Sequence, residues 1–288
     1  MKRYLPILIL ITLAACTPKA EKLQSPLGDK IANKVNTPTS QPTKEVTSAP
    51  GEEKAVKKVA FDHSAFDGLL KKYAKYPKGR VDYKGLLSEK AVLDAYIKTI
   101  DEANLSDLGP NDTKALLINA YNANTLSLIL NNYGKIESIR DIDKPWDAVK
   151  YKVAGDKVSL NNIEHNLLRA VFKDPRIHFA VNCASIGCPP LPDFTFEGAT
   201  LDSQLDTVIT DAFANPRYIK VEGKKLAVSS LLKWYGEDFT KKDWNPRAET
   251  LPEFVAKYAS GEVKSFLEKN PKPKVKFQDY DWSLNDIE

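Results

Sequence analysis

The spacing of apolar and polar residues along the chain predicts amphipathic helices interrupted by short hairpins. The longest helical pattern covers residues 111–133, where Asn111 or Asp112 is a suitable N-cap and Gly134 ends the helix. Further helical patterns cover residues 61–73, 88–102, 161–171, 201–214, 229–239 and 252–269. Hairpins are predicted at residues 151–160 and 217–228, and single strands at residues 176–181 and 275–285. Helices mixed with short antiparallel hairpins predict an α+β fold.

These patterns begin at about residue 59 and continue to the C-terminus without a second linker or an internal repeat. We therefore expect a single globular domain over residues 59–288, with helices packed on short hairpins. Residues 17–58 are rich in Lys, Glu, Thr, Ser and Pro and almost lack aromatic residues. Such a composition does not bury enough apolar surface to offset the entropy of ordering, so it predicts a disordered tether.

The first 16 residues resemble a lipoprotein signal peptide. Lys2 and Arg3 precede a short apolar stretch, and residues 13–16 read LAAC, which is similar to a bacterial lipobox. Cleavage before Cys16 would leave its thiol to carry a lipid anchor to a membrane. An ordinary signal peptide with a chance Cys is the alternative. Because Thr17 rather than Asp follows the cysteine, we expect a cell-envelope protein on the outer membrane, facing the periplasm.

Charge and composition exclude several classes of function. Loss of Lys2 and Arg3 with the signal peptide lowers the formal net charge from +4 to +2, and no dense basic face that would bind nucleic acid is present. The chain has no Gly-rich phosphate loop and no dinucleotide fingerprint, and we expect no cofactor. The envelope is oxidising, so two neighbouring cysteines there are candidates for a disulfide.

The helical pattern at residues 111–133 places Asn119 and Asn122 on the same face as Leu126 and Ile129. A buried amide needs several hydrogen-bond partners, so both amides require an explanation. The first interpretation is structural: the amides hold the backbone of a neighbouring loop or strand. The second is that Asn119 or Asn122 orients an active-site group or a ligand.

The pattern at residues 161–171 carries two titratable side chains, Glu164 and His165. Asn161 and Glu164 have the spacing of a capping box, which predicts that Glu164 caps this helix. His165 follows directly and points in a different direction. It is either a hydrogen-bonded structural residue or a candidate catalytic base.

The segment at residues 174–191 reads DPRIHFAVNCASIGCPPL and concentrates most of the candidate chemistry. It is expected to place His178 on a short strand and Cys183 just past the end of that strand. Cys183 and Cys188 are five positions apart, so a disulfide between them would close a small loop. That bond would be structural, or a redox pair if strained.

A second interpretation makes Cys183 a nucleophile whose thiol is activated by the imidazole of His178 or His165. Asn119, Asn122 or Asn182 would then orient the imidazole. A third interpretation is a zinc site formed by His178, Cys183 and Cys188 with Asp193 or His165, although the spacings are not those of familiar zinc motifs. Two inert buried thiols are the remaining alternative.

Several motifs occur in order along the chain: VDY at residues 81–83, INAYNA at 118–123, GxxVSLNNIEHNLLR from Gly155, the cysteine segment, and WYGEDF at 234–239. Together they resemble the family called domain of unknown function 547, from about residue 61 to the C-terminus. The resemblance implies a secreted or envelope bacterial domain and supplies no settled activity. It implies that these residues cluster: Asn119, Tyr121, Asn122, Glu164, His165, His178, Cys183, Ser185, Cys188 and Pro189.

A strand that carries a His after a core helix is also similar, at the level of fold, to papain- and transglutaminase-like proteins. Those folds place a Cys at the start of the central helix, and residues 111–133 contain no Cys. The primary hypothesis is a cysteine-dependent hydrolase or acyltransferase that acts on a peptide or a cell-wall-type substrate. The alternative is a non-catalytic binding or assembly module with a structural Cys183–Cys188 disulfide and a protein partner.

Overall fold

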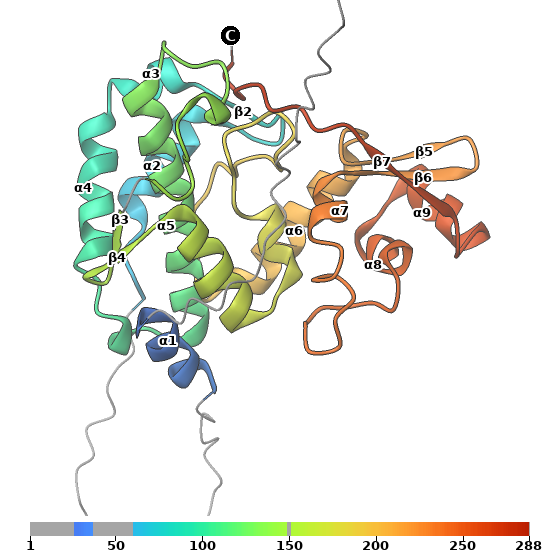
Figure 1. Cartoon of the computed structure of the whole chain (residues 1–288), viewed down its shortest axis with the longest axis horizontal. Coiled ribbons are helices and arrows are strands. Elements are labelled where there is room, and N and C mark those ends of the chain that lie inside the picture. Colours follow the sequence, from blue (N-terminus) through green and yellow to red (C-terminus); the bar gives the residue numbers. More distant parts are fainter. Residues whose placement is uncertain (1–25, 37–59, 149–150, 288) are drawn as a thin grey trace, which may run out of the picture.

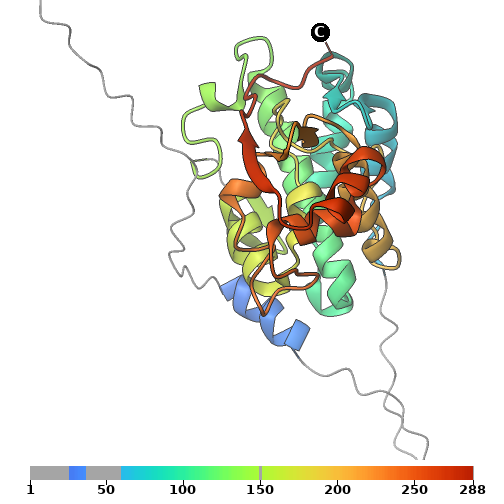
Figure 2. The same cartoon turned by 90° about the vertical axis from the view of Figure 1, so that its right-hand side faces the viewer.

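The computed structural model describes residues 26–36, 60–148 and 151–287. It confirms an α+β fold. Helices α2, α4 and α5 lie on one side of the molecule, and the sheet formed by β5, β6 and β7 lies on the other with α8 and α9 (Figure 1). Viewed from the side of the sheet, β7 and α9 lie in front of the central helix α5 (Figure 2). Among the described residues, no helix is both long and apolar enough to cross a membrane.

Helix α5 (Pro110–Asn132) is the centre of the core, because every residue from 113 to 130 is buried. A helix that is buried on all sides must be covered by several neighbours. The elements that pack against it include α4 and the π-helix η3 (Asn162–Phe172). The remaining helices after residue 60 are α2 (Ser64–Tyr73), α3 (Tyr83–Leu87), α4 (Lys90–Asp101), α6 (Leu201–Ala214), α7 (Leu231–Trp234), α8 (Leu251–Tyr258) and α9 (Gly261–Lys269), with 3₁₀ turns η1 (Leu105–Asp107) and η2 (Ile139–Asp141).

The strands are short. β1 (Ala74–Lys75) pairs with β2 (Arg80–Val81), and β3 (Tyr151–Val153) pairs with β4 (Asp156–Val158), both antiparallel. β5 (Ile219–Glu222) and β6 (Lys225–Ser229) form the second predicted hairpin. β7 (Lys274–Gln278) joins β6 in parallel, with Leu226 opposite Val275. The predicted strand at residues 275–285 is therefore shorter and ends before the aromatic residues that follow it.

Two predicted helices differ from the structure at their C-terminal regions. The pattern at 229–239 forms only the short α7, and the pattern at 252–269 is divided into α8 and α9. The division coincides with Gly261, whose φ of 55° lies in the left-handed region. Glycine adopts that conformation without the steric cost that a side chain would add.

The predicted strand at residues 176–181 is wrong, because the segment forms the 3₁₀ helix η4 (Pro175–Phe179). Asp174 caps this helix by accepting a hydrogen bond from the Arg176 backbone N–H at 3.0 Å. The Asp174 carboxylate also pairs with the Lys114 ammonium and the Arg176 guanidinium, and all three groups are buried. An Asp followed by Pro is a helix-start signal, which the apolar run obscured.

Within the expected tether at residues 17–58, the structure has a helix, α1 (Pro26–Asn36). Leu27 and Ile31, four positions apart, are buried against η3 and α5. The expectation of disorder is corrected for this stretch, because its two apolar residues share one helix face and find a surface to cover. The rest of the predicted tether, and the signal sequence with Cys16, lie outside the described residues.

Replacing Ile31 with Ala tests the docking of α1. Burial of the Ile31 side chain predicts a loss of about 2–4 kcal/mol in the free energy of unfolding. Urea denaturation of the full chain measures this loss. The control is Asp29→Ala on the exposed face of the same helix, which should change the stability by less than about 0.5 kcal/mol. Equal effects of the two substitutions would contradict the docking of α1.

Candidate functional site

The segment that follows η4 is held in place by buried amides. Asn122 on α5 donates from Nδ2 to the Ala180 carbonyl at 2.9 Å and accepts from the Asn182 backbone N–H at 2.9 Å. The Asn182 side chain donates to the Pro189 carbonyl at 2.7 Å and accepts from the Ala184 N–H at 2.8 Å. The structural interpretation of Asn122 is the one that these contacts support. The amides fix both ends of the loop that carries the cysteines.

Asn119 has the same role one turn earlier on α5. Its amide donates to the Phe196 carbonyl at 2.8 Å, and its oxygen accepts from the Phe196 N–H at 3.0 Å. Both polar ends of this buried side chain are therefore satisfied by backbone. Among the described residues, neither Asn119 nor Asn122 has a hydrogen bond with a histidine or with a cysteine sulfur.

The cysteine loop turns sharply at Ala184, whose φ is 61°. A residue with a side chain pays roughly 1–2 kcal/mol to occupy this left-handed region. The turn brings the Ser185 hydroxyl to 3.2 Å from the Cys183 sulfur. The conformation of the loop therefore places its Ser185 hydroxyl within hydrogen-bond distance of the Cys183 thiol.

The C-terminal segment crosses this loop after leaving β7 and runs back towards β2 (Figure 1). Gly187 and Ile186 donate backbone hydrogen bonds to Asp281 and Ser283, at 2.8 and 2.9 Å. A Cβ atom at Gly187 would lie 2.9 Å from the Asp281 nitrogen, so the close crossing requires glycine here. The crossing delivers the Tyr280 hydroxyl to 3.3 Å from the Cys183 sulfur.

The two thiols lie together but differ in environment. The Cys183 N–H donates to the Cys188 sulfur at 3.0 Å. Cys183 is partly exposed, whereas Cys188 is buried and directed at the Val181 carbonyl. Hydrogen bonding from the Cys188 thiol, with help from Ser185 and Tyr280, lowers the pKa of Cys183 to about 7. Burial and the adjacent Cys183 raise the pKa of Cys188 well above its ordinary value.

His178 does not contact Cys183. Its Nε2–H donates to the Asp238 carboxylate at 2.8 Å, and its ring stacks on Tyr235 with the centroids 3.9 Å apart. Asp238 also accepts two hydrogen bonds from the Arg169 guanidinium. The Nδ1 atom of His178 is buried and has no hydrogen-bond partner. Burial lowers the pKa of His178, so the imidazole is neutral at neutral pH.

The other predicted titratable residues lie on the π-helix η3 (Asn162–Phe172). The Glu164 carboxylate accepts from the Tyr235 hydroxyl at 2.8 Å. Asn161 makes no side-chain capping hydrogen bond. At the start of the helix the Ser159 hydroxyl accepts from the Asn162 N–H at 3.2 Å, and the Asn162 side-chain oxygen accepts from the Ser159 N–H at 3.0 Å. The capping role predicted for Glu164 is therefore corrected. The partly exposed His165 ring accepts from the Arg169 guanidinium at 3.1 Å.

The pKa values of these carboxylates reflect their partners. Burial opposes the ionisation of Glu164, but the neighbouring His165 side chain, the Tyr235 hydroxyl and the Arg169 guanidinium together outweigh it and lower its pKa. Burial likewise opposes ionisation of Asp238, and the hydrogen bonds from His178 and Arg169 lower its pKa. Both Glu164 and Asp238 are therefore ionised at neutral pH.

Tyr121 links the two parts of the site. Its side chain on α5 is buried, and burial raises its pKa well above the ordinary value. Further increases come from the charges of Glu164, Cys183 and Cys188, which all act on this hydroxyl. The predicted residues therefore do come together, but as a thiol pair backed by a separate hydrogen-bonded network of imidazole, carboxylate and guanidinium groups.

The structure bears on two of the predicted alternatives, the disulfide and the zinc site. Both cysteines are free thiols in the structure, so the predicted disulfide is not present. Within residues 26–36, 60–148 and 151–287, no three His, Cys, Asp or Glu side chains are arranged to hold a metal ion, which leaves the zinc interpretation without support.

Three important residues escaped the sequence analysis: Tyr235, Asp238 and Tyr280. Tyr235 and Asp238 belong to the WYGEDF motif, which carries the resemblance but has no predicted role. Tyr280 lies 97 positions from Cys183, in a segment whose alternation predicted only a strand. No local pattern signals such a contact.

The comparison with known families supports the resemblance over part of the chain, because the VDY and WYGEDF motifs lie outside the matched residues. The family model described as "Protein of unknown function, DUF547" matches residues 105–211. The matched region contains α5, η3 and both cysteines. No curated protein and no solved structure matches this chain, so the similarity to papain- and transglutaminase-like folds gains no support.

The hydrogen bonds to Cys183 predict its alkylation profile. The rate of reaction with iodoacetamide should reach half its maximum near pH 7, because the thiolate is the reactive form. Tyr280→Phe and Ser185→Ala each remove a donor to the thiolate, so each should move the midpoint up by roughly 0.5–1 pH unit. Tyr76→Phe is the control, because its hydroxyl contacts Asp211 instead. Unshifted midpoints in both variants would show that these hydroxyls do not stabilise the thiolate.

Proposed function

We propose that this protein is a thiol–disulfide exchange enzyme in which Cys183 is the nucleophile and Cys188 is the resolving thiol. The observation that supports it is the asymmetric pair: a partly exposed Cys183 in contact with a buried Cys188. Exchange needs an accessible thiolate that attacks first and a second thiol within reach that attacks afterwards. A low pKa at Cys183 and a high pKa at Cys188 fit this order.

The reaction balances with a disulfide of another molecule as the co-reactant. The Cys183 thiolate attacks one sulfur of that disulfide, which breaks the bond, releases one thiolate and leaves a mixed disulfide at Cys183. Cys188 then loses its proton to solvent and attacks the Cys183 sulfur. This step releases the second thiolate and leaves a Cys183–Cys188 disulfide. The substrate is reduced by two electrons and the protein is oxidised by two.

The hydrolase or acyltransferase of the sequence hypothesis is the second candidate. It is favoured by the donors at the Cys183 sulfur, because the Ser185 backbone N–H and the Tyr280 hydroxyl could also donate to the oxygen of a thioester. It lacks an imidazole in contact with the thiol, since His178 is committed to Asp238 and His165 to Arg169. Exchange needs no such base once a substantial fraction of the thiol is ionised.

The proposed setting is the cell envelope, with the domain anchored through a lipid on Cys16. The lipobox-like sequence supports the anchor. A reactive thiol pair is also suited to an oxidising compartment, where disulfides form and exchange.

The stoichiometry of reaction with hydroxyethyl disulfide tests the proposal. The fully reduced protein, with Cys16 replaced by Ser so that only the pair reacts, should release two thiols per molecule and retain no adduct, because Cys188 resolves the mixed disulfide. Cys188→Ala should release one thiol and retain a stable adduct on Cys183. Cys183→Ser, which preserves the size of the side chain, should react at least about 100-fold more slowly.

The other candidates give different results in the same set of proteins. Release of a single thiol by the wild-type protein would overturn the exchange mechanism. Turnover of a p-nitrophenyl ester that persists in Cys188→Ala and is lost in Cys183→Ser would support acyl transfer. No reaction of Cys183 with either reagent would leave the non-catalytic binding module.

A further inference from the structure

Four partly exposed aromatic side chains gather beside the Cys183 thiol and are called here the aromatic surface: Trp146, Trp234, Tyr280 and Trp282. The Tyr280 ring centroid lies 4.7 Å from that of Trp234 and 4.6 Å from that of Trp282. Trp282 also packs on Trp234 at 5.7 Å and on Trp146 at 6.1 Å. Large aromatic groups gathered at partial exposure are typical of binding surfaces.

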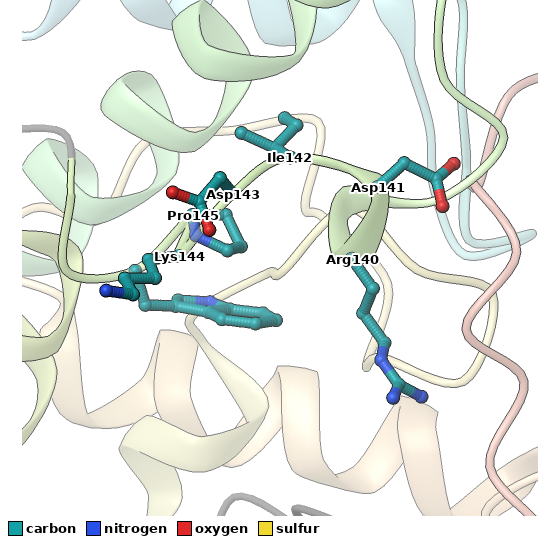
Figure 3. A pocket seen from close by; sticks show the side chains of 7 residues that line it. Arg140, Asp141, Ile142, Asp143, Lys144 and Pro145 are labelled. Atoms are coloured by element: carbon teal, nitrogen blue, oxygen red, sulfur yellow. The ribbon is translucent and has the colours of Figure 1, made fainter.

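The end of the aromatic surface far from the thiol leads into a pocket of about 430 Å³, formed by residues 140–146 (Figure 3). Trp146 belongs to both the pocket and the aromatic surface. A pocket of this volume is large enough for a small ligand or for side chains of a bound peptide. Its connection to Tyr280 places it on a continuous path of contacts to Cys183.

Arg140 supplies a cation at this pocket. Its guanidinium lies over the Trp282 ring, 5.2 Å from the centroid, and the side chain is exposed. Within the described part of the chain, it forms no ion pair. The carboxylate of Asp141 accepts from the Glu137 and Ser138 N–H groups at 2.8 and 2.9 Å, and Figure 3 shows it pointing away from the Arg140 guanidinium.

The remaining charged side chains of the pocket do not neutralise the positive charge of Arg140. Asp143 and Lys144 are adjacent, exposed and opposite in charge, so they offset one another at a distance. A guanidinium held on an indole face is positioned to donate two hydrogen bonds to a carboxylate. The pocket therefore matches a ligand with an acidic group.

The contacts between the Cys183 thiol and Arg140 limit the length of a ligand that would reach both. The contacts from the Cys183 sulfur to Tyr280, from Tyr280 to Trp282, and from Trp282 to Arg140 are 3.3, 4.6 and 5.2 Å long. With the width of the rings included, an extended peptide at roughly 3.3 Å per residue covers this path with at most about four or five residues.

We propose that the aromatic surface and Arg140 form a substrate subsite for an extended acidic peptide, whose reactive cysteine lies at Cys183 and whose carboxylate, about four residues away, binds Arg140. The inference rests on the proposed function for the identity of the reacting group. The subsite itself is a binding surface and is tested without that chemistry.

Peptide binding to the full chain carrying Cys183→Ser tests the subsite, because no exchange occurs in this protein. The probes are fluorescein-labelled nine-residue peptides with Ser in place of the reactive cysteine and Glu or Gln four residues from it, on either side. Fluorescence anisotropy should show that a Glu peptide binds about five- to tenfold more tightly than its Gln counterpart. Equal binding of the Glu and Gln peptides would overturn the proposal.

Variants of the subsite locate the effect. Arg140→Gln should abolish the preference for Glu, and Arg140→Lys should retain part of it, because Lys keeps the charge but not the two-pronged geometry. Lys135→Gln removes an exposed positive charge five positions before Arg140 in the sequence and should leave the preference intact. Loss of the preference in Lys135→Gln as well would assign it to general charge attraction and overturn the role of Arg140.

A second set of variants tests the aromatic surface. Trp282→Phe should weaken both peptides by about threefold and Trp282→Ala by about tenfold or more. Failure of these peptides to bind would overturn the subsite even if the reduced wild-type protein exchanges with hydroxyethyl disulfide. Binding with no exchange would reject the proposed function and keep the subsite, so the two failures are distinguishable.

Discussion

The hydrogen bonds between the Asn122 side chain and the backbone of residues 180 and 182 are the constraint on which the candidate site depends. A loop has no ladder of its own to fix its conformation, and buried backbone groups must find partners elsewhere. Here a side chain from the most deeply buried helix provides them. Asn182 extends the same arrangement to Pro189 and Ala184, so the loop between the two cysteines is set by the core.

The fixed loop explains why the two thiols differ although they lie only five positions apart. The Cys183 sulfur is partly exposed and contacts the hydroxyls of Ser185 and Tyr280. Cys188 is buried, and it contacts the Val181 carbonyl and the Tyr218 hydroxyl. Hydrogen-bond donors favour the thiolate at Cys183, and burial disfavours it at Cys188. The difference in pKa between the two thiols therefore follows from how the backbone of the loop is held.

The network behind the thiols has a different character. His178, Asp238 and Arg169 form a buried set of charge-assisted hydrogen bonds, and Tyr235 joins it to Glu164. Such a set strengthens the packing of η3 and η4 against α7 and the residues that follow it. The unpartnered Nδ1 of His178 is the one polar atom of this network left unsatisfied within the described residues.

The sequence was sufficient for features that depend on local pattern. The helix α5 and the second hairpin follow from periodicity, whereas the burial of α5 on all sides does not. η4 was misassigned because a short apolar run is compatible with a strand or a helix, although the Asp174–Pro175 pair signalled the helix. Tyr280 and Asp238 could not be assigned, because their partners lie 97 and 60 positions away and the contacts arise only when the chain folds.

The most direct test of the thiol pair is a redox titration of the full protein in buffers with increasing ratios of oxidised to reduced glutathione. Intact and peptide mass spectrometry would follow Cys183 and Cys188 in a protein whose Cys16 is replaced by Ser. A reversible pair predicts one transition in which the mass falls by two hydrogen atoms and the bond maps to Cys183 and Cys188. Independent attachment of glutathione to each cysteine, or two thiols that stay reduced at every ratio, would contradict it.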